Sequence, residues 1–201
     1  SRGLGDMYKR QVRITGTEMK ETINQFEQDR RSNGTRKAVR SLISEAFLIW
    51  MDVLEQASAE NDESCRVSVT RTECSLDRNT VIRITVGMGE MLSIRDAFLI
   101  SAIVDEQRAS REFLMDFAER PKQPSNAQRL EQLLSDAFRD PSARPDMKRC
   151  DQAINMLFDI IDMIPKPYRA QPFAVISYIM WWMGQELSLI HISEPTRRTP
   201  I

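Results

Sequence analysis

Apolar side chains recur at intervals of three and four residues along most of this 201-residue chain. Residues 35–54 show the pattern most clearly, because their apolar side chains fall on one stripe of a helix that repeats every 3.6 residues. The stripe comprises Val39, Ile43, Ala46, Phe47, Trp50 and Leu54, and Leu42, Ile49 and Val53 widen it. So wide an apolar face predicts a deeply buried helix. Similar spacing elsewhere predicts an all-α fold.

Capping residues, glycine and proline divide this pattern into separate helices. The first helix is expected to end at Asn33-Gly34, and Thr35 is expected to open the second. The expected N-terminal caps are Thr17, Ser93 paired with Asp96, Ser125 paired with Gln128, and Asp146. The connections at Pro121 and Pro165 are short, which predicts antiparallel helical hairpins. Such hairpins would form a bundle or a short tetratricopeptide-like solenoid.

Residues 61–90 allow two interpretations. Residues 66–70 and 81–86 alternate in polarity and are rich in β-branched side chains, which predicts a small β-hairpin over 65–86. The alternative is a helix from about Leu76 to Met88, although propensity alone favours the strands.

The two ends of the chain encode one another. The segment 187–197 back-translates into DNA whose reverse complement reads as residues 1–11, except that Met7 stands where valine would be expected. Both segments resemble a transposase sequencing adapter translated at the two ends of a library insert. Residues 1–11 and 187–201 are therefore expected to be adapter artefact and are set aside from fold reasoning.

The remaining residues, 12–186, are expected to form a single helical domain fragment internal to a longer gene. We expect a helical pair over 12–60, the ambiguous segment over 61–90, and helical hairpins over 91–186.

Charge and composition argue against several classes of function. The chain has 28 basic and 29 acidic residues, and the two terminal segments carry more basic than acidic ones, so the remainder is mildly acidic. This charge gives no electrostatic case for general binding to nucleic acid or to an anionic membrane. The single histidine, His191, lies in the second adapter-like segment. We therefore expect no histidine-based catalytic residues, no metal site and no cofactor.

The cysteines and the last apolar run indicate in which cellular compartment the protein is expected and whether it is expected to span a membrane. Cys65, Cys74 and Cys150 are odd in number and lack a C-x-x-C spacing, which argues against a zinc site or a disulfide framework and favours a reducing cytoplasm. Residues 173–183 are nearly all apolar, but a run of about 11 residues is short for a bilayer and typical of a buried helix. A membrane role is not expected.

Two stretches carry a resemblance to a known family. One is Ile94-Arg95-Asp96-Ala97-Phe98-Leu99. The other comprises Leu157-Phe158-Asp159-Ile160-Ile161, Pro165, Tyr168-Arg169-Ala170-Gln171-Pro172-Phe173-Ala174-Val175-Ile176 and Trp181-Trp182-Met183-Gly184. Together they resemble the C-terminal half of an actinobacterial domain of unknown function, number 4192, over roughly residues 76–186. The resemblance implies a helix in the ambiguous segment and an actinobacterial, cytoplasmic protein. It implies no chemistry.

Basic residues gather around the expected turn at Asn33-Gly34. They are Arg30, Arg31, Arg36, Lys37 and Arg40. One interpretation is a contact with phosphate or RNA at the start of the second helix, where backbone N–H groups favour anions. The alternative, which we favour, is a solvated turn between two helices of an acidic protein.

Two further sets are candidates for an interface or ligand contact. Arg95 and Asp96 form the most motif-like polar pair, and Arg95 is placed to reach a neighbouring helix. Tyr178, Trp181 and Trp182 would give a partner an aromatic surface, although core packing is the favoured alternative. Adjacent helical residues point about 100° apart, so both tryptophans are buried only if the helix is covered on more than one side.

These observations favour a non-catalytic helical interaction or scaffold module. Its partner would be another protein or the missing part of its own chain. The first alternative is a helical accessory part of an enzyme whose active site lies in a missing N-terminal region. The second is a nucleic-acid-associated accessory module that uses the basic cluster.

Overall fold

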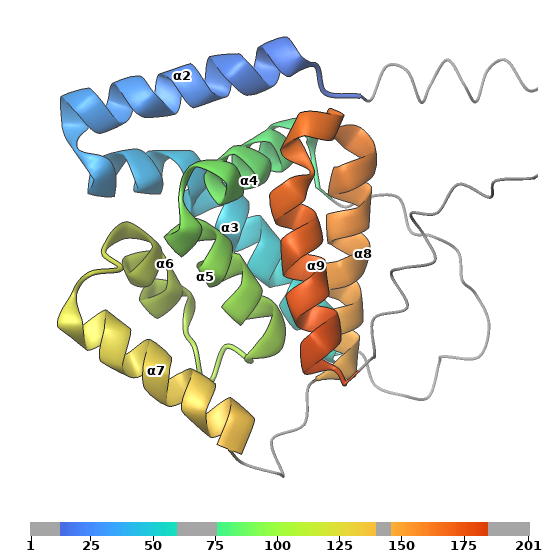
Figure 1. Cartoon of the computed structure of the whole chain (residues 1–201). Coiled ribbons are helices and arrows are strands. Elements are labelled where there is room, and N and C mark those ends of the chain that lie inside the picture. Colours follow the sequence, from blue (N-terminus) through green and yellow to red (C-terminus); the bar gives the residue numbers. More distant parts are fainter. Residues whose placement is uncertain (1–12, 60–75, 140–145, 185–201) are drawn as a thin grey trace, which may run out of the picture.

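A computed structural model describes residues 13–59, 76–139 and 146–184. Within these residues eight α-helices pack into one bundle and no strand occurs, which confirms the predicted all-α class (Figure 1). The helices are α2 (Gly16–Asn33), α3 (Thr35–Ala59), α4 (Arg78–Glu90), α5 (Leu92–Ile103), α6 (Arg111–Glu119), α7 (Pro124–Arg139), α8 (Met147–Met163) and α9 (Ala170–Trp182). A short 3-10 helix, η2 (Lys166–Tyr168), precedes α9.

Helix α3 is the centre of the bundle, with α2, α4, α5, α6 and α8 packed against it. Helices α2 and α3 form an antiparallel hairpin around Gly34, which ends α2 with a φ of 82° (Figure 1). Helices α8 and α9 form a second antiparallel hairpin. Helix α7 lies at the edge of the bundle against α6.

The predicted β-hairpin is wrong over its second half, because residues 81–86 lie inside helix α4. The Asp77 side chain caps this helix by accepting hydrogen bonds from the N–H groups of Asn79 and Thr80. Helix α4 packs against α2, α3, α5, α8 and α9, so it is buried on nearly every side. A helix covered all round needs no polar stripe, which is why its β-branched run imitates a strand. Residues 66–70 lie outside the described residues.

Three predicted caps are also wrong. Helix α2 begins at Gly16, so Thr17 lies inside it, and its N-cap is Thr15, which forms a capping box with Glu18. Ser93 is buried inside α5 and donates a hydrogen bond to the Ala118 carbonyl oxygen at 2.9 Å. The chain passes from α4 to α5 through Met91 alone, so α5 begins before Ser93 can cap it.

Ser125 lies within the first turn of α7, after Pro124. Asp146 caps α8 as predicted, accepting from the Arg149 N–H at 3.1 Å.

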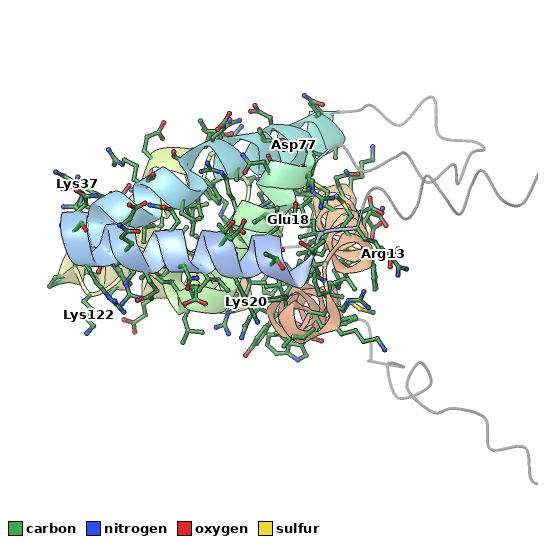
Figure 2. All side chains as sticks on the ribbon, turned by 90° about the horizontal axis from the view of Figure 1, so that it is seen from above. Arg13, Glu18, Lys20, Lys37, Asp77 and Lys122 are labelled. Atoms are coloured by element: carbon green, nitrogen blue, oxygen red, sulfur yellow. The ribbon has the colours of Figure 1, made fainter. Side chains whose placement is uncertain are left out.

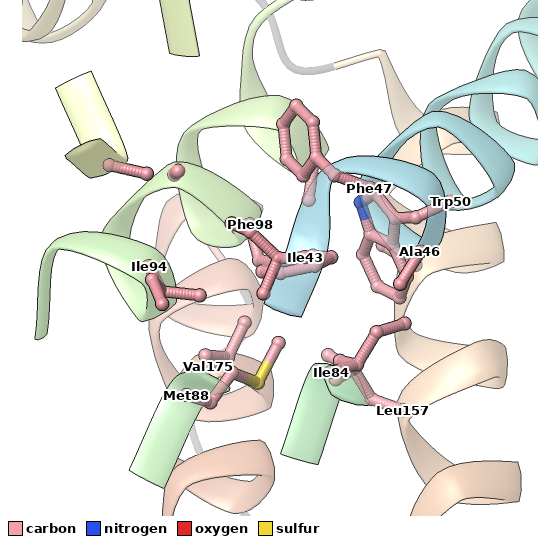
Figure 3. Close-up of a cluster of buried hydrophobic side chains, with 14 of the residues drawn as sticks. Ile43, Ala46, Phe47, Trp50, Ile84, Met88, Ile94, Phe98, Leu157 and Val175 are labelled. Carbon is pink, nitrogen blue, oxygen red and sulfur yellow. The ribbon is translucent and has the colours of Figure 1, made fainter. Parts of the chain in front are cut away.

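Aromatic side chains of α3 and α5 meet in the middle of the core (Figure 3). The Phe98 ring lies edge-on to Phe47 and to Trp50, with ring centroids 5.1 and 5.3 Å away. The fully buried Trp50 Nε1 donates to the Ser101 hydroxyl oxygen at 3.0 Å. The core is therefore built around α3 and fixes how α5 crosses it.

The N-terminal end of α2 is fastened to α4 by a bidentate ion pair. Arg78 Nε and Nη2 donate to the two Glu18 carboxylate oxygens at 2.9 and 2.7 Å. Seen from above, Glu18 lies on the side of α2 that faces Asp77, and Lys20 lies on the other side (Figure 2). The Arg78 hydrogen bonds, with those of Thr15, lower the pKa of Glu18 to about 2.

We expect acid to weaken the fold through Glu18. Because the folded-state pKa, about 2, lies below the ordinary 4.5, its stabilisation is complete above about pH 4.5 and is lost as the pH falls toward 2. The carboxylate is about one third exposed, so screening limits this contribution to about 1 kcal/mol. Urea unfolding at pH 7 and pH 3 should show a smaller pH dependence for Glu18→Gln than for the wild type. The exposed Glu45→Gln serves as control, and an equal reduction there would contradict the assignment.

Candidate interaction surface

Helix α9 carries no charged side chain between Ala170 and Gly184, yet one of its faces is open to solvent. Its inward face is formed by the buried Pro172, Val175, Ile176 and Ile179, which pack into the core. Its outward face presents Phe173, Tyr178 and Trp181, which are 46%, 53% and 60% exposed. This set, which we call the α9 aromatic face, is the candidate functional site.

The sequence fixes α9 at both of its ends. Arg169, just before the helix, donates from Nε and Nη2 to the Ile164 carbonyl oxygen at 3.1 and 3.0 Å and so holds the turn from α8. Pro172 sits in the first turn, where its missing N–H costs no helical hydrogen bond. Gly184 follows the helix with a φ of 71°, in the region that favours glycine.

The two adjacent tryptophans have different surroundings. Trp182 is half-buried and packs against the core, whereas Trp181 is exposed. Of the two tryptophans, core packing therefore describes Trp182 and not Trp181 among the helices that the structure describes. The reason is geometric: α9 packs on α4, α5 and α8 with one side, and the next residue of a helix points about 100° away. Phe173 belongs to the same exposed set, and the sequence prediction missed it because it read the whole run as buried.

Arg95 and Asp96 form an ion pair of neighbours on α5, with Arg95 Nη2 2.7 Å from Asp96 Oδ1. Arg95 Nη1 also donates to the Gln171 side-chain oxygen at 3.4 Å, so the expected bridge to another helix reaches α9. Gln171 lies in the first turn of α9 and Trp181 in the last, about 15 Å apart at 1.5 Å per residue. The pair thus positions α9 and is not part of the aromatic face.

The predicted basic cluster is partly neutralised by a carboxylate that no sequence pattern singles out. Glu119, at the end of α6, is buried, and its oxygens accept from Arg36 Nε at 3.1 Å and Arg40 Nε at 2.6 Å. The Glu119 hydrogen bond and charge raise the pKa of Arg40. Arg40 and Arg36 lie 79 and 83 residues from Glu119 in the sequence. Only the tertiary fold therefore brings these two cations to the carboxylate.

The other members of the cluster lie along the same end of the hairpin. Arg30 pairs with Glu27 at 2.7 Å, and Arg31 approaches the same carboxylate at 4.0 Å. Lys37 lies at the end of the α2–α3 pair and is exposed (Figure 2). The cluster therefore contains two separate sets of ion pairs, one within α2 and one between α3 and α6, in which Arg30, Arg31, Arg36 and Arg40 share the two carboxylates of Glu27 and Glu119.

Reactive groups elsewhere in the described residues are few. Burial raises the pKa of the Cys150 thiol to about 12, which keeps it protonated and unreactive at neutral pH. No group of three or more His, Cys, Asp or Glu side chains in the described part of the chain could hold a metal ion. Among the same residues, no helix has the length and apolar character needed to cross a membrane.

Comparison with known proteins gives no match, whether by family model, by curated sequence or by solved structure.

Proposed function

We propose that this protein is a non-catalytic helical interaction or scaffold module and that the α9 aromatic face contacts a protein partner. One observation carries the proposal: three large aromatic side chains stand exposed on a helix that has no charged residue. Contiguous exposed apolar surface is uncommon on soluble domains and marks interaction sites. Tyrosine and tryptophan are also the residues that contribute most to binding energy at protein interfaces.

The chemistry of the face indicates the kind of partner. An uncharged aromatic surface gains most from covering by another apolar surface, such as the apolar stripe of an amphipathic helix. Such binding should persist at high ionic strength, because no charge pair is involved. We further place the protein in an actinobacterial cytoplasm, on the basis of the family resemblance and the cysteine pattern.

Site-specific photo-crosslinking in an actinobacterial host tests the proposal. A photoreactive phenylalanine analogue at position 181 should give discrete protein adducts that remain at about 1 M NaCl, where the Debye length is about 3 Å. The same analogue at position 48 is the matched control, since Leu48 is 46% exposed on α3. Equal adducts at both positions, or none at position 181, would contradict the proposal.

The basic cluster gives less support to the nucleic-acid alternative. Phosphate binding requires basic side chains that are free to neutralise phosphates, and the Glu119 carboxylate, shared by Arg36 and Arg40, cancels one of their two positive charges. The enzyme alternative places its chemistry in another part of the gene and gains no support from the groups described above.

A further inference from the structure

A cleft of about 360 Å³ lies between α2, α3 and α4, away from the α9 aromatic face. Its volume falls at the small end of the range of ligand sites in proteins, which is about 300–1,000 Å³. The buried side chains of Phe26 and Leu42 line its apolar part. A lining that combines buried apolar groups with polar ones is the usual composition of a small-molecule site.

The polar lining contains charges of both signs that do not pair with one another. Glu21 and Asp29 contribute carboxylates from α2, and Arg83 contributes a guanidinium from α4. Within the described part of the chain, neither Glu21 nor Arg83 forms an ion pair. Asp29 accepts one hydrogen bond, from Gln25 Nε2 at 3.1 Å. The carboxylates and the guanidinium therefore border the same space while remaining open to an outside partner.

Arg83 is held rigidly in place by other groups. Its Nη1 donates to the carbonyl oxygens of Ser41 and Leu42 at 2.8 and 3.1 Å, and its Nε donates to the Asn79 side-chain oxygen at 3.3 Å. These bonds go to neutral acceptors, so the positive charge is oriented but not neutralised. None of them uses Nη2, whose two N–H groups are left to bind an acceptor. A fixed cation with free donors is suited to a carboxylate.

We propose that this cleft binds a free amino acid as a zwitterion. The ligand carboxylate would accept hydrogen bonds from Arg83, and its ammonium group would donate to one of the two carboxylates, Glu21 or Asp29, which lie about 12 Å apart along α2. The opposite charges of the ligand match those of the lining, and an amino acid is small enough for the cleft. Burial of its side chain against Phe26 and Leu42 would favour an apolar amino acid over a charged one.

Chemical-shift titration of the ¹⁵N-labelled full chain with each standard amino acid tests this inference. At about 10 mM, tenfold above a Kd of about 1 mM, at least one apolar amino acid should shift the amide resonances of cleft residues. Putrescine, which carries only positive charge, and acetate, which carries only negative charge, should not. Absence of shifts with every amino acid, or equal shifts with putrescine, would overturn the proposal.

Two variants separate the roles of the opposite charges. Arg83→Met should weaken binding about tenfold by removing charge-assisted hydrogen bonds. Glu21→Gln should weaken it about threefold, because Glu21 is exposed and Asp29 remains. Glu45→Gln, an exposed change on α3 outside the cleft, should leave the Kd unchanged. Glu21 lies on the surface, so its variant stays interpretable if Arg83→Met fails to fold. An equal loss in Glu45→Gln would overturn the proposal.

Discussion

Trp50→Ala should lower the free energy of unfolding by about 3–5 kcal/mol, the usual cost of removing a buried aromatic side chain. Trp50 is fully buried, lies edge-on to Phe98 with ring centroids 5.3 Å apart, and donates a hydrogen bond to Ser101. The variant loses this packing and leaves a cavity between α3 and α5. Urea denaturation followed by circular dichroism measures the change.

Trp181→Ala is the matched control, because it removes the same side chain from an exposed position. Its free energy of unfolding should stay within about 0.5 kcal/mol of the wild type. If both variants were equally destabilised, Trp181 would be a core residue and the α9 aromatic face would not exist as described.

A comparably large loss, about 3–5 kcal/mol, is expected for Arg149→Ala. Arg149 is fully buried near the start of α8. Its Nε donates to the Ser101 carbonyl oxygen at 2.7 Å and its Nη1 to a Glu55 carboxylate oxygen at 2.5 Å. Ser101 lies in the last turn of α5, where carbonyl groups lack helical partners, so Arg149 caps α5 from another helix. The variant leaves that carbonyl oxygen without its donor and opens a cavity.

Arg149→Met separates the two contributions, since it restores most of the volume without the guanidinium. We expect it to recover less than half of the loss, because the Ser101 carbonyl stays without a donor. Arg108→Ala, at an exposed site between α5 and α6, should change the free energy by no more than about 0.5 kcal/mol. Full recovery in Arg149→Met would show that Arg149 acts through packing alone.

The α9 aromatic face could be predicted only in part from the sequence. Tyr178, Trp181 and Trp182 are candidates because aromatic residues favour interfaces, but the sequence does not show which of the two adjacent tryptophans faces outward. That depends on which helices cover α9. The basic cluster contains a contact that the sequence does not reveal, because Glu119 lies far along the chain from Arg36 and Arg40 and pairs with them only in the fold. The cleft lined by Glu21 and Arg83 has no sequence signature, since its residues come from three helices.

The sequence by itself determined most of the helices outside residues 81–86, because apolar spacing and glycines act within a few residues of one another. The break at Gly34, the cap at Asp146 and the buried stripe of α3 could be read directly. Tertiary structure decided what depends on contacts between distant segments. It made residues 81–86 a helix, since α4 is covered on nearly every side and its pattern carries no polar face. It also buried Arg149 and left Trp181 exposed, because burial of a side chain is set by the helices packed around it.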